Sequence, residues 1–150
     1  MMITIARKAL LDAGQFFEAA GSLGREGTGM LAGFLGPNGG RIERFFAPDQ
    51  RAGAHPSCWV EVTRVGKEQL AVGLDPDERW LARIHSHPAD AFHSRTDDAN
   101  PGLTAEDALS IVVPYFGLAL RQGLDACALY ERREGLWLAR TAAELGIELT

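Results

Sequence analysis

Apolar residues recur along this chain with two spacings, and the spacing in each stretch predicts the element that forms there. Near the N-terminus they follow the spacing of one helix face, at Ala6, Leu10, Ala13, Phe17 and Ala20. Ile3 and Ile5 precede this stripe and predict a short strand, and Gly21 and Gly24 predict the end of the helix. The chain therefore opens with a strand and an amphipathic helix.

A strand pattern dominates the next part of the chain. Residues Thr28 to Leu35 are predicted to form a strand, in which Gly29 and Gly33 permit the close approach of another backbone. The turn residues Pro37 to Gly40 lead into a second apolar run, Arg41 to Ala47. The two runs predict a hairpin with a slightly long loop.

Shorter elements follow in the middle of the chain. Cys58 to Val62 alternates as a strand, and Thr63 to Leu70 predicts a short helix for which Thr63 is the candidate N-cap. A turn at Asp75 to Asp77 leads into the apolar run Trp80 to Ile84, which predicts a strand that ends before Pro88.

The last third of the chain predicts a mixture of both elements. Thr104 to Asp107 has the form of a capping box and predicts a helix of one or two turns. Ile111 to Phe116 reads as a buried strand whose Pro114 restricts its pairing to a sheet edge or a bulge. Two further segments predict a hairpin and one predicts a helical tail: Ala126 to Glu131, Gly135 to Ala139 and Thr141 to Leu145.

Helices interleaved with strands in this order predict an α/β or α+β fold, a mixed sheet flanked by helices. The length of 150 residues and the 46% hydrophobic content predict one domain spanning residues 1–150. The formal net charge is −5 and the basic residues are scattered, so no nucleic-acid groove is expected. Arg132 and Arg133 are interpreted as a solvated strand end.

Cys58 and Cys127 form no C-x-x-C motif and are interpreted as buried free thiols, which suits a reducing cytoplasm. No segment approaches the ~18 apolar residues of a membrane span, and the N-terminus lacks the pattern of an export signal. We therefore expect a cytoplasmic protein without a membrane partner.

The strongest chemical signal lies at the end of the predicted strand Trp80 to Ile84. His85 and His87 are two residues apart, so an extended backbone places both imidazoles on one side, where they can bind one ion. Nitrogen ligands completed by a carboxylate from the following loop suit zinc with an open position for water. Taken alone, an H-x-H tripeptide is more often a pair of surface or core histidines.

Two further motifs favour the metal site over a pair of ordinary histidines. Upstream, Glu26 opens an E-x-x-G-x-L-x-G pattern, and downstream the two histidines are followed by Pro88 and by Ser94-x-x-Asp97. In this order the motifs resemble those of the JAMM (MPN+) metalloprotease family. The resemblance implies a cytidine-deaminase-like sheet flanked by helices over nearly the whole chain.

The loop after the histidines departs from the family pattern. Six residues, Pro88 to His93, separate His87 from Ser94, one fewer than is usual in the family. The serine-to-aspartate spacing makes Asp97 the third zinc ligand, whereas the total distance from His87 points to Asp98. We predict Asp97, because a loop absorbs a deletion more easily than a short turn changes register.

The resemblance also implies the roles of the residues. Zinc (Zn²⁺) is held by His85, His87 and Asp97, with Glu26 as the general base and Ser94 as the hydrogen-bond donor to the oxyanion. Such enzymes cut the bond after the C-terminal glycine of a ubiquitin-like protein. Short versions of this kind work beside activating and conjugating enzymes, some of them in antiphage systems.

Two alternatives remain open on the sequence. The chain is a small-molecule or sulfur-carrier amidase, or it is a non-catalytic MPN scaffold that only binds partners. Retention of the complete set of motif residues argues against the scaffold, and substrate choice depends on loop shape, which the sequence does not reveal.

Overall fold

The computed structural model describes residues 2–53, 60–91, 103 and 105–150. Eight strands form one sheet in the order β10-β1-β3-β2-β6-β7-β8-β9, and β4 pairs with β5 separately. In chain order the elements are β1 (Met2–Ile5), α1 (Arg7–Gly21), β2 (Thr28–Gly36), β3 (Gly39–Phe46), β4 (Gln50–Ala52), β5 (Val60–Val62), α2 (Arg64–Val72), β6 (Arg79–Ser86), β7 (Leu109–Val113), η1 (Tyr115–Gln122), β8 (Ala128–Arg133), β9 (Leu136–Arg140), α4 (Ala142–Leu145) and β10 (Ile147–Leu149). The mixed sheet with few helices confirms the predicted fold class.

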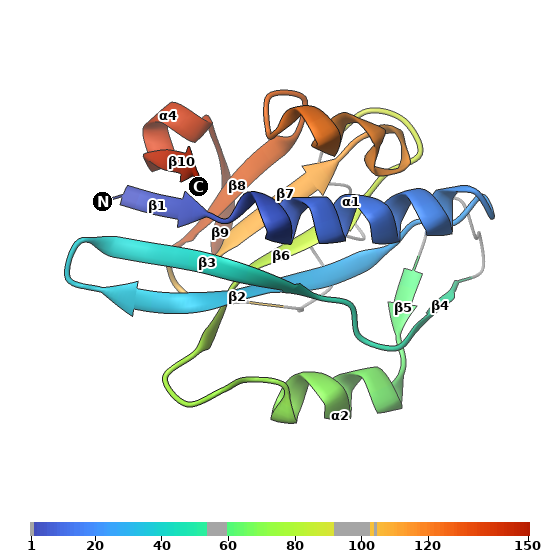
Figure 1. Cartoon of the computed structure of the whole chain (residues 1–150), viewed down its shortest axis with the longest axis horizontal. Helices are drawn as coiled ribbons and strands as arrows, with labels where there is room; N and C mark the ends of the chain where they lie inside the picture. The colour runs from blue at the N-terminus through green and yellow to red at the C-terminus, as the bar shows by residue number, and fades with distance from the viewer. Residues whose placement is uncertain (1, 54–59, 92–102, 104) are drawn as a thin grey trace.

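Helix α1 runs across one face of the sheet (Figure 1), and the core lies beneath it. Its predicted stripe is confirmed, because Leu10, Ala13 and Phe17 are all buried. Phe17 is completely buried and packs with the rings of Phe16 and Phe45. Burial of one such ring contributes roughly 1.5–3 kcal/mol.

Strand β6 has a central place that decides where the chemistry can occur. It pairs antiparallel with β2, with Thr28 opposite His85, and parallel with β7, with His85 opposite Val112. The start of β2 and the ends of β6 and β7 therefore meet at one edge of the sheet. At the other end of the same ladder, Gly33 lies opposite Arg79.

The first hairpin is confirmed, but its predicted long loop is wrong. Gly36 pairs with Gly39, so only Pro37 and Asn38 form the turn. Gly39 has a φ of +136° and lies against the main chain of Met2, where a side chain has no room. The predicted close approach at Gly33 is also present, since a Cβ there would lie 1.9 Å from the Arg41 carbonyl oxygen.

Helix α2 and the closing hairpin also form where the sequence predicts them. Thr63 caps α2 by accepting a hydrogen bond from the Gly66 N–H at 3.1 Å. Strands β8 and β9 pair antiparallel, and the tail forms the short helix α4 with a capping box between Thr141 and Glu144. Figure 1 shows α2 apart from the large sheet, beside β4 and β5.

Two predictions about the last third of the chain are wrong. No helix follows the proposed capping box within the described residues: Thr104 lies outside them, Asp107 has a φ of +68°, and β7 begins at Leu109. The pairing of β7 is not confined to an edge, because this strand lies between β6 and β8. Pro114 falls just after the last strand residue, so its missing N–H removes no bond of the ladder.

The two arginines interpreted as a solvated strand end differ from each other. Arg133 is exposed and pairs with Asp107 at 2.7 Å, whereas the guanidinium carbon of Arg132 lies 5.3 Å from the centroid of the Trp137 ring. The Arg132 side chain is therefore partly buried by stacking, and the interpretation was wrong for this residue.

Cys127 is a free thiol, as predicted, and burial raises the pKa of this thiol to about 12. Cys58 lies outside the described residues. No helix in the described part of the chain is long and apolar enough to cross a membrane.

Candidate metal centre

Strand β6 delivers both predicted histidines to the same place. His85 lies in the strand and His87 just after it, and both are buried. The ring centroids are 4.9 Å apart, and the two Nε2 atoms are 3.1 Å apart. Two nitrogen ligands on one tetrahedral zinc, each at about 2.0–2.1 Å, lie about 3.3 Å from one another. The observed separation is close to that value, so these nitrogens fit one ion.

The other nitrogen of His87 fixes its tautomer. Nδ1 lies 3.2 Å from the main-chain oxygen of Asp90, which can only accept a hydrogen bond. Nδ1 therefore carries the proton, and Nε2 presents its lone pair toward His85. A carbonyl that holds the distal nitrogen in this way orients a metal-binding imidazole and raises its basicity.

Glu26 lies between α1 and β2, and its backbone is tied to the histidine strand. The next residue, Gly27, donates its N–H to Ser86 Oγ at 2.8 Å and accepts from the Ser86 N–H at 2.9 Å. Ser86 is the residue between the two histidines and is fully buried. The structure thus brings the Glu26 segment to His85 and His87, although they are far apart in the sequence.

Gly27 is required at this junction because of the surrounding aromatic rings. A Cβ at this position would lie 2.8 Å from Phe17 and 2.9 Å from Phe16, closer than carbon atoms can approach. Any larger residue here would force one of the two rings to move, so the junction between α1 and β2 favours glycine.

A hollow of about 440 Å³ opens beside Glu26. Its walls come from the end of α1, the Glu26 segment and the β4–β5 ribbon, and they combine four alanines with larger side chains such as Phe16, Leu23 and Arg25. We call it the Glu26 groove. Gln50 closes one side of it, because its amide donates to the Thr28 carbonyl and accepts from the Thr28 N–H, both at 2.8 Å. Gln50 thus replaces a strand partner where β3 no longer pairs with β2.

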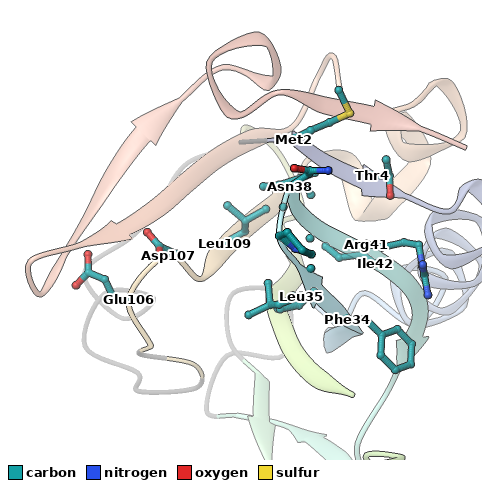
Figure 2. Close-up of a pocket in the computed structure, with 16 residues that line it drawn as sticks. Met2, Thr4, Phe34, Leu35, Asn38, Arg41, Ile42, Glu106, Asp107 and Leu109 are labelled. Carbon is teal, nitrogen blue, oxygen red and sulfur yellow. The ribbon is translucent and has the colours of Figure 1, made fainter. Parts of the chain in front are cut away.

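A larger hollow of about 1160 Å³ lies elsewhere (Figure 2). It is lined by the start of β1, the β2–β3 turn and the segment before β7, and by neither histidine nor Glu26. The acidic side chains at its wall have partners: Asp107 pairs with Arg133 at 2.7 Å, and Glu106 accepts from the Glu134 N–H at 3.1 Å. Size alone does not make this hollow the site, since the predicted site residues Glu26, His85 and His87 lie at the other end of β2 and β6.

The remaining predicted site residues, Ser94, Asp97 and the alternative Asp98, lie outside the described residues. In the described ranges, no group of three or more His, Cys, Asp or Glu side chains is close enough to hold a metal ion. The described part of the chain therefore supplies two adjacent imidazole nitrogens, with the backbone of the Glu26–Gly27 segment hydrogen-bonded to the residue between them.

Sequence reasoning missed the supporting residues Ser86 and Gln50. Ser86 had one available signal, its position between the two histidines on the opposite face of the strand. No sequence signal connects Gln50 with Thr28, because their contact depends on how the β4–β5 ribbon folds back.

Comparison with known proteins supports the fold described above. The fold is that of a JAB1/MPN domain: a JAB1/MPN domain protein from Archaeoglobus fulgidus matches 99% of this chain and 98% of its own, with a TM-score of 0.57 and 13% identity. The solution structure of a Desulfitobacterium hafniense protein matches 99% of this chain and 93% of its own, with a TM-score of 0.67 and 20% identity. No protein family model matches the chain.

In sequence, the chain is similar to the probable metalloprotease y4jG of Sinorhizobium fredii, with 58% identity over 36 residues. This match covers 24% of the present chain and 22% of that relative. The predicted resemblance is therefore confirmed at two levels: the JAB1/MPN fold over nearly the whole chain, and a sequence similarity to a probable metalloprotease over a short stretch.

Proposed function

We propose that this protein is a zinc-dependent peptidase or isopeptidase that cleaves after the C-terminal glycine of a ubiquitin-like protein. The observation that carries the proposal is the 3.1 Å separation of the two Nε2 atoms, with the Glu26 segment hydrogen-bonded to the residue between those histidines. The JAB1/MPN fold and the similarity to a probable metalloprotease support a metallopeptidase.

In this proposal His85, His87 and Asp97 hold the metal. When bound, zinc lowers the pKa of a water ligand to about 7, which supplies hydroxide at neutral pH. Glu26 accepts the proton and returns it to the leaving amine, a role worth roughly 10²–10⁴ in rate. Ser94 donates a hydrogen bond to the developing oxyanion.

The Glu26 groove suggests the kind of substrate. The four alanines in its wall leave space beside Glu26, which suits an extended tail with small side chains, such as a glycine-ended one. A tail of this kind can add to a strand through main-chain hydrogen bonds. Because the tail offers little surface, most of the binding energy would come from the folded body of the substrate.

The proposal extends to activating and conjugating enzymes of a bacterial ubiquitin-like or antiphage system as partners. The competing candidates are a small-molecule or sulfur-carrier amidase and a metal-free scaffold. The short Nε2 separation favours metal binding over a scaffold, because a scaffold gains nothing from two adjacent buried imidazoles.

Metal analysis and a substrate comparison test the proposal. We expect about one zinc per chain and loss of activity on chelation. An intact ubiquitin-like fusion from the same genome should be cut far faster than a peptide that carries only its tail. If the chain takes up no zinc, even after reconstitution, the proposal that it is a zinc enzyme would be refuted. Equal cleavage of both substrates would favour the amidase.

A further inference from the structure

The turn that follows β7 has an unusual backbone. Tyr115, Phe116 and Gly117 have φ values of +55°, +53° and +87° in succession. Residues other than glycine rarely adopt this left-handed region, and bulky ones do so only when surrounding contacts enforce it. Two such residues in a row therefore require a structural reason.

The turn holds the main chain around His87. The Phe116 N–H donates to the His87 carbonyl at 2.8 Å, and the Tyr115 N–H donates to the Ala89 carbonyl at 3.1 Å. The His87 N–H donates to the Val113 carbonyl at 2.8 Å, on the strand just before the turn. Both main-chain polar groups of His87 are thus fixed by the end of β7 and the turn.

Helix α1 supports the turn from the other side. A Cβ on Gly21 would lie 2.4 Å from Phe116 Cβ, and a Cβ on Gly117 would lie 2.6 Å from Phe17 Cβ. The turn is therefore packed tightly between α1 and the segment that carries His87. The same helix leads into Glu26, so one packed unit connects both parts of the site.

We propose that the left-handed turn at Tyr115 and Phe116 is a positioning device that holds the His87 imidazole in its metal-binding place. The inference rests on the metal-binding role in the proposed function. If the turn opens, His87 leaves its place, and the apparent metal affinity falls in proportion to the fraction of molecules with the turn closed.

Position 115 allows a test with little change in packing, because Tyr115 is 52% exposed. Valine is β-branched and resists the left-handed region, whereas asparagine tolerates it. We expect Tyr115→Val to weaken zinc binding about tenfold in a chelator competition, by depopulating the closed turn. Tyr115→Asn should stay within about twofold of the wild type, since it keeps the backbone preference.

Glu134 provides a matched control. It is exposed, has a φ of +50° and lies in the turn between β8 and β9. Glu134→Val imposes the same kind of backbone strain far from His87 in the chain, so it should lower the melting temperature while leaving zinc affinity unchanged. An equal loss of zinc affinity in both valine variants would overturn the proposal.

Hydrogen exchange of the metal-free protein gives a second readout. A tenfold loss of zinc affinity requires that only about a tenth of the Tyr115→Val molecules have the closed turn, so the Tyr115 and Phe116 amides should lose nearly all their protection in this variant and keep it in the wild type and in Glu134→Val. Unchanged exchange or unchanged zinc affinity in Tyr115→Val would refute the positioning role, and so would an equal loss in Tyr115→Asn, which would assign the effect to the phenol ring. If wild type binds no zinc, the proposed function fails, and exchange alone decides whether the turn holds His87.

Discussion

The bond between Ser86 and Gly27 gives a sharp test of how the site is assembled. Ser86→Ala removes the acceptor of the Gly27 N–H, which lies 2.8 Å from Ser86 Oγ in a fully buried place. A buried donor left without a partner costs about 1–3 kcal/mol. The second bond, from the Ser86 N–H to the Gly27 carbonyl at 2.9 Å, remains, so the fold should survive.

We expect this penalty to displace the Glu26 segment rather than the histidines. The unsatisfied N–H can regain a partner only if the Glu26 segment shifts, whereas His85 stays in the β6 ladder opposite Thr28. A penalty of about 1–3 kcal/mol corresponds to a roughly 5–150-fold smaller population with the base in place. We expect kcat to fall roughly thirtyfold, the middle of that range, with zinc content unchanged.

The assay compares kcat, zinc content and melting temperature in Ser86→Ala and in a control, Thr141→Ala. Thr141 caps α4 by accepting from the Glu144 N–H at 3.1 Å, and its loss costs about 1 kcal/mol. The control should lose stability without losing kcat. If Ser86→Ala keeps full kcat, or if it loses zinc, the Gly27–Ser86 link does not position the base.

Three further predictions follow from individual residues. Glu26→Gln should keep its zinc and lose roughly 10²–10⁴ of its turnover, whereas loss of zinc as well would make this residue a ligand. Asp97→Ala should abolish zinc binding and Asp98→Ala should not; the reverse result would mean that the motif is shifted by one residue. Hydrogen bonds from Arg44 at 2.6 and 2.8 Å lower the pKa of buried Glu78. The stabilisation by ionised Glu78 is complete above the pKa of this group in the unfolded chain, and it is lost as the pH falls through its lower pKa in the folded protein. Glu78→Gln should therefore make the free energy of unfolding depend less on pH in that window.

The sequence predicted the strands and helices whose pattern is set locally. The α1 stripe and the Thr63 cap follow from side chains within one or two turns of each other, so neighbouring residues carry enough information. The strands β4 and β10 have three residues each, too few for alternation to be visible. The false helix after Thr104 shows the same limit, because Asp107 takes a left-handed conformation that a capping pattern does not reveal.

The candidate site shows a different limit of prediction. Its candidate residues could be predicted because each carries a distinctive side chain in a fixed spacing, as in the pair His85 and His87. The residues that hold them were not visible, because their role depends on contacts across the sheet. Phe116 packs against Gly21 and donates its N–H to His87, and neither contact can be read from local sequence.

The sheet topology explains why such distant residues can share a site. Antiparallel pairing of β2 with β6 puts the start of one strand beside the end of the other, and parallel pairing of β6 with β7 brings their ends together. Glu26, His87 and the turn at Tyr115 therefore lie at one edge of the sheet, although they are far apart in the sequence. This edge is formed by segments that enter or leave strands, so their side chains are available for chemistry. The strand interiors behind them, where Ile84 pairs with Ile111, remain a packed core.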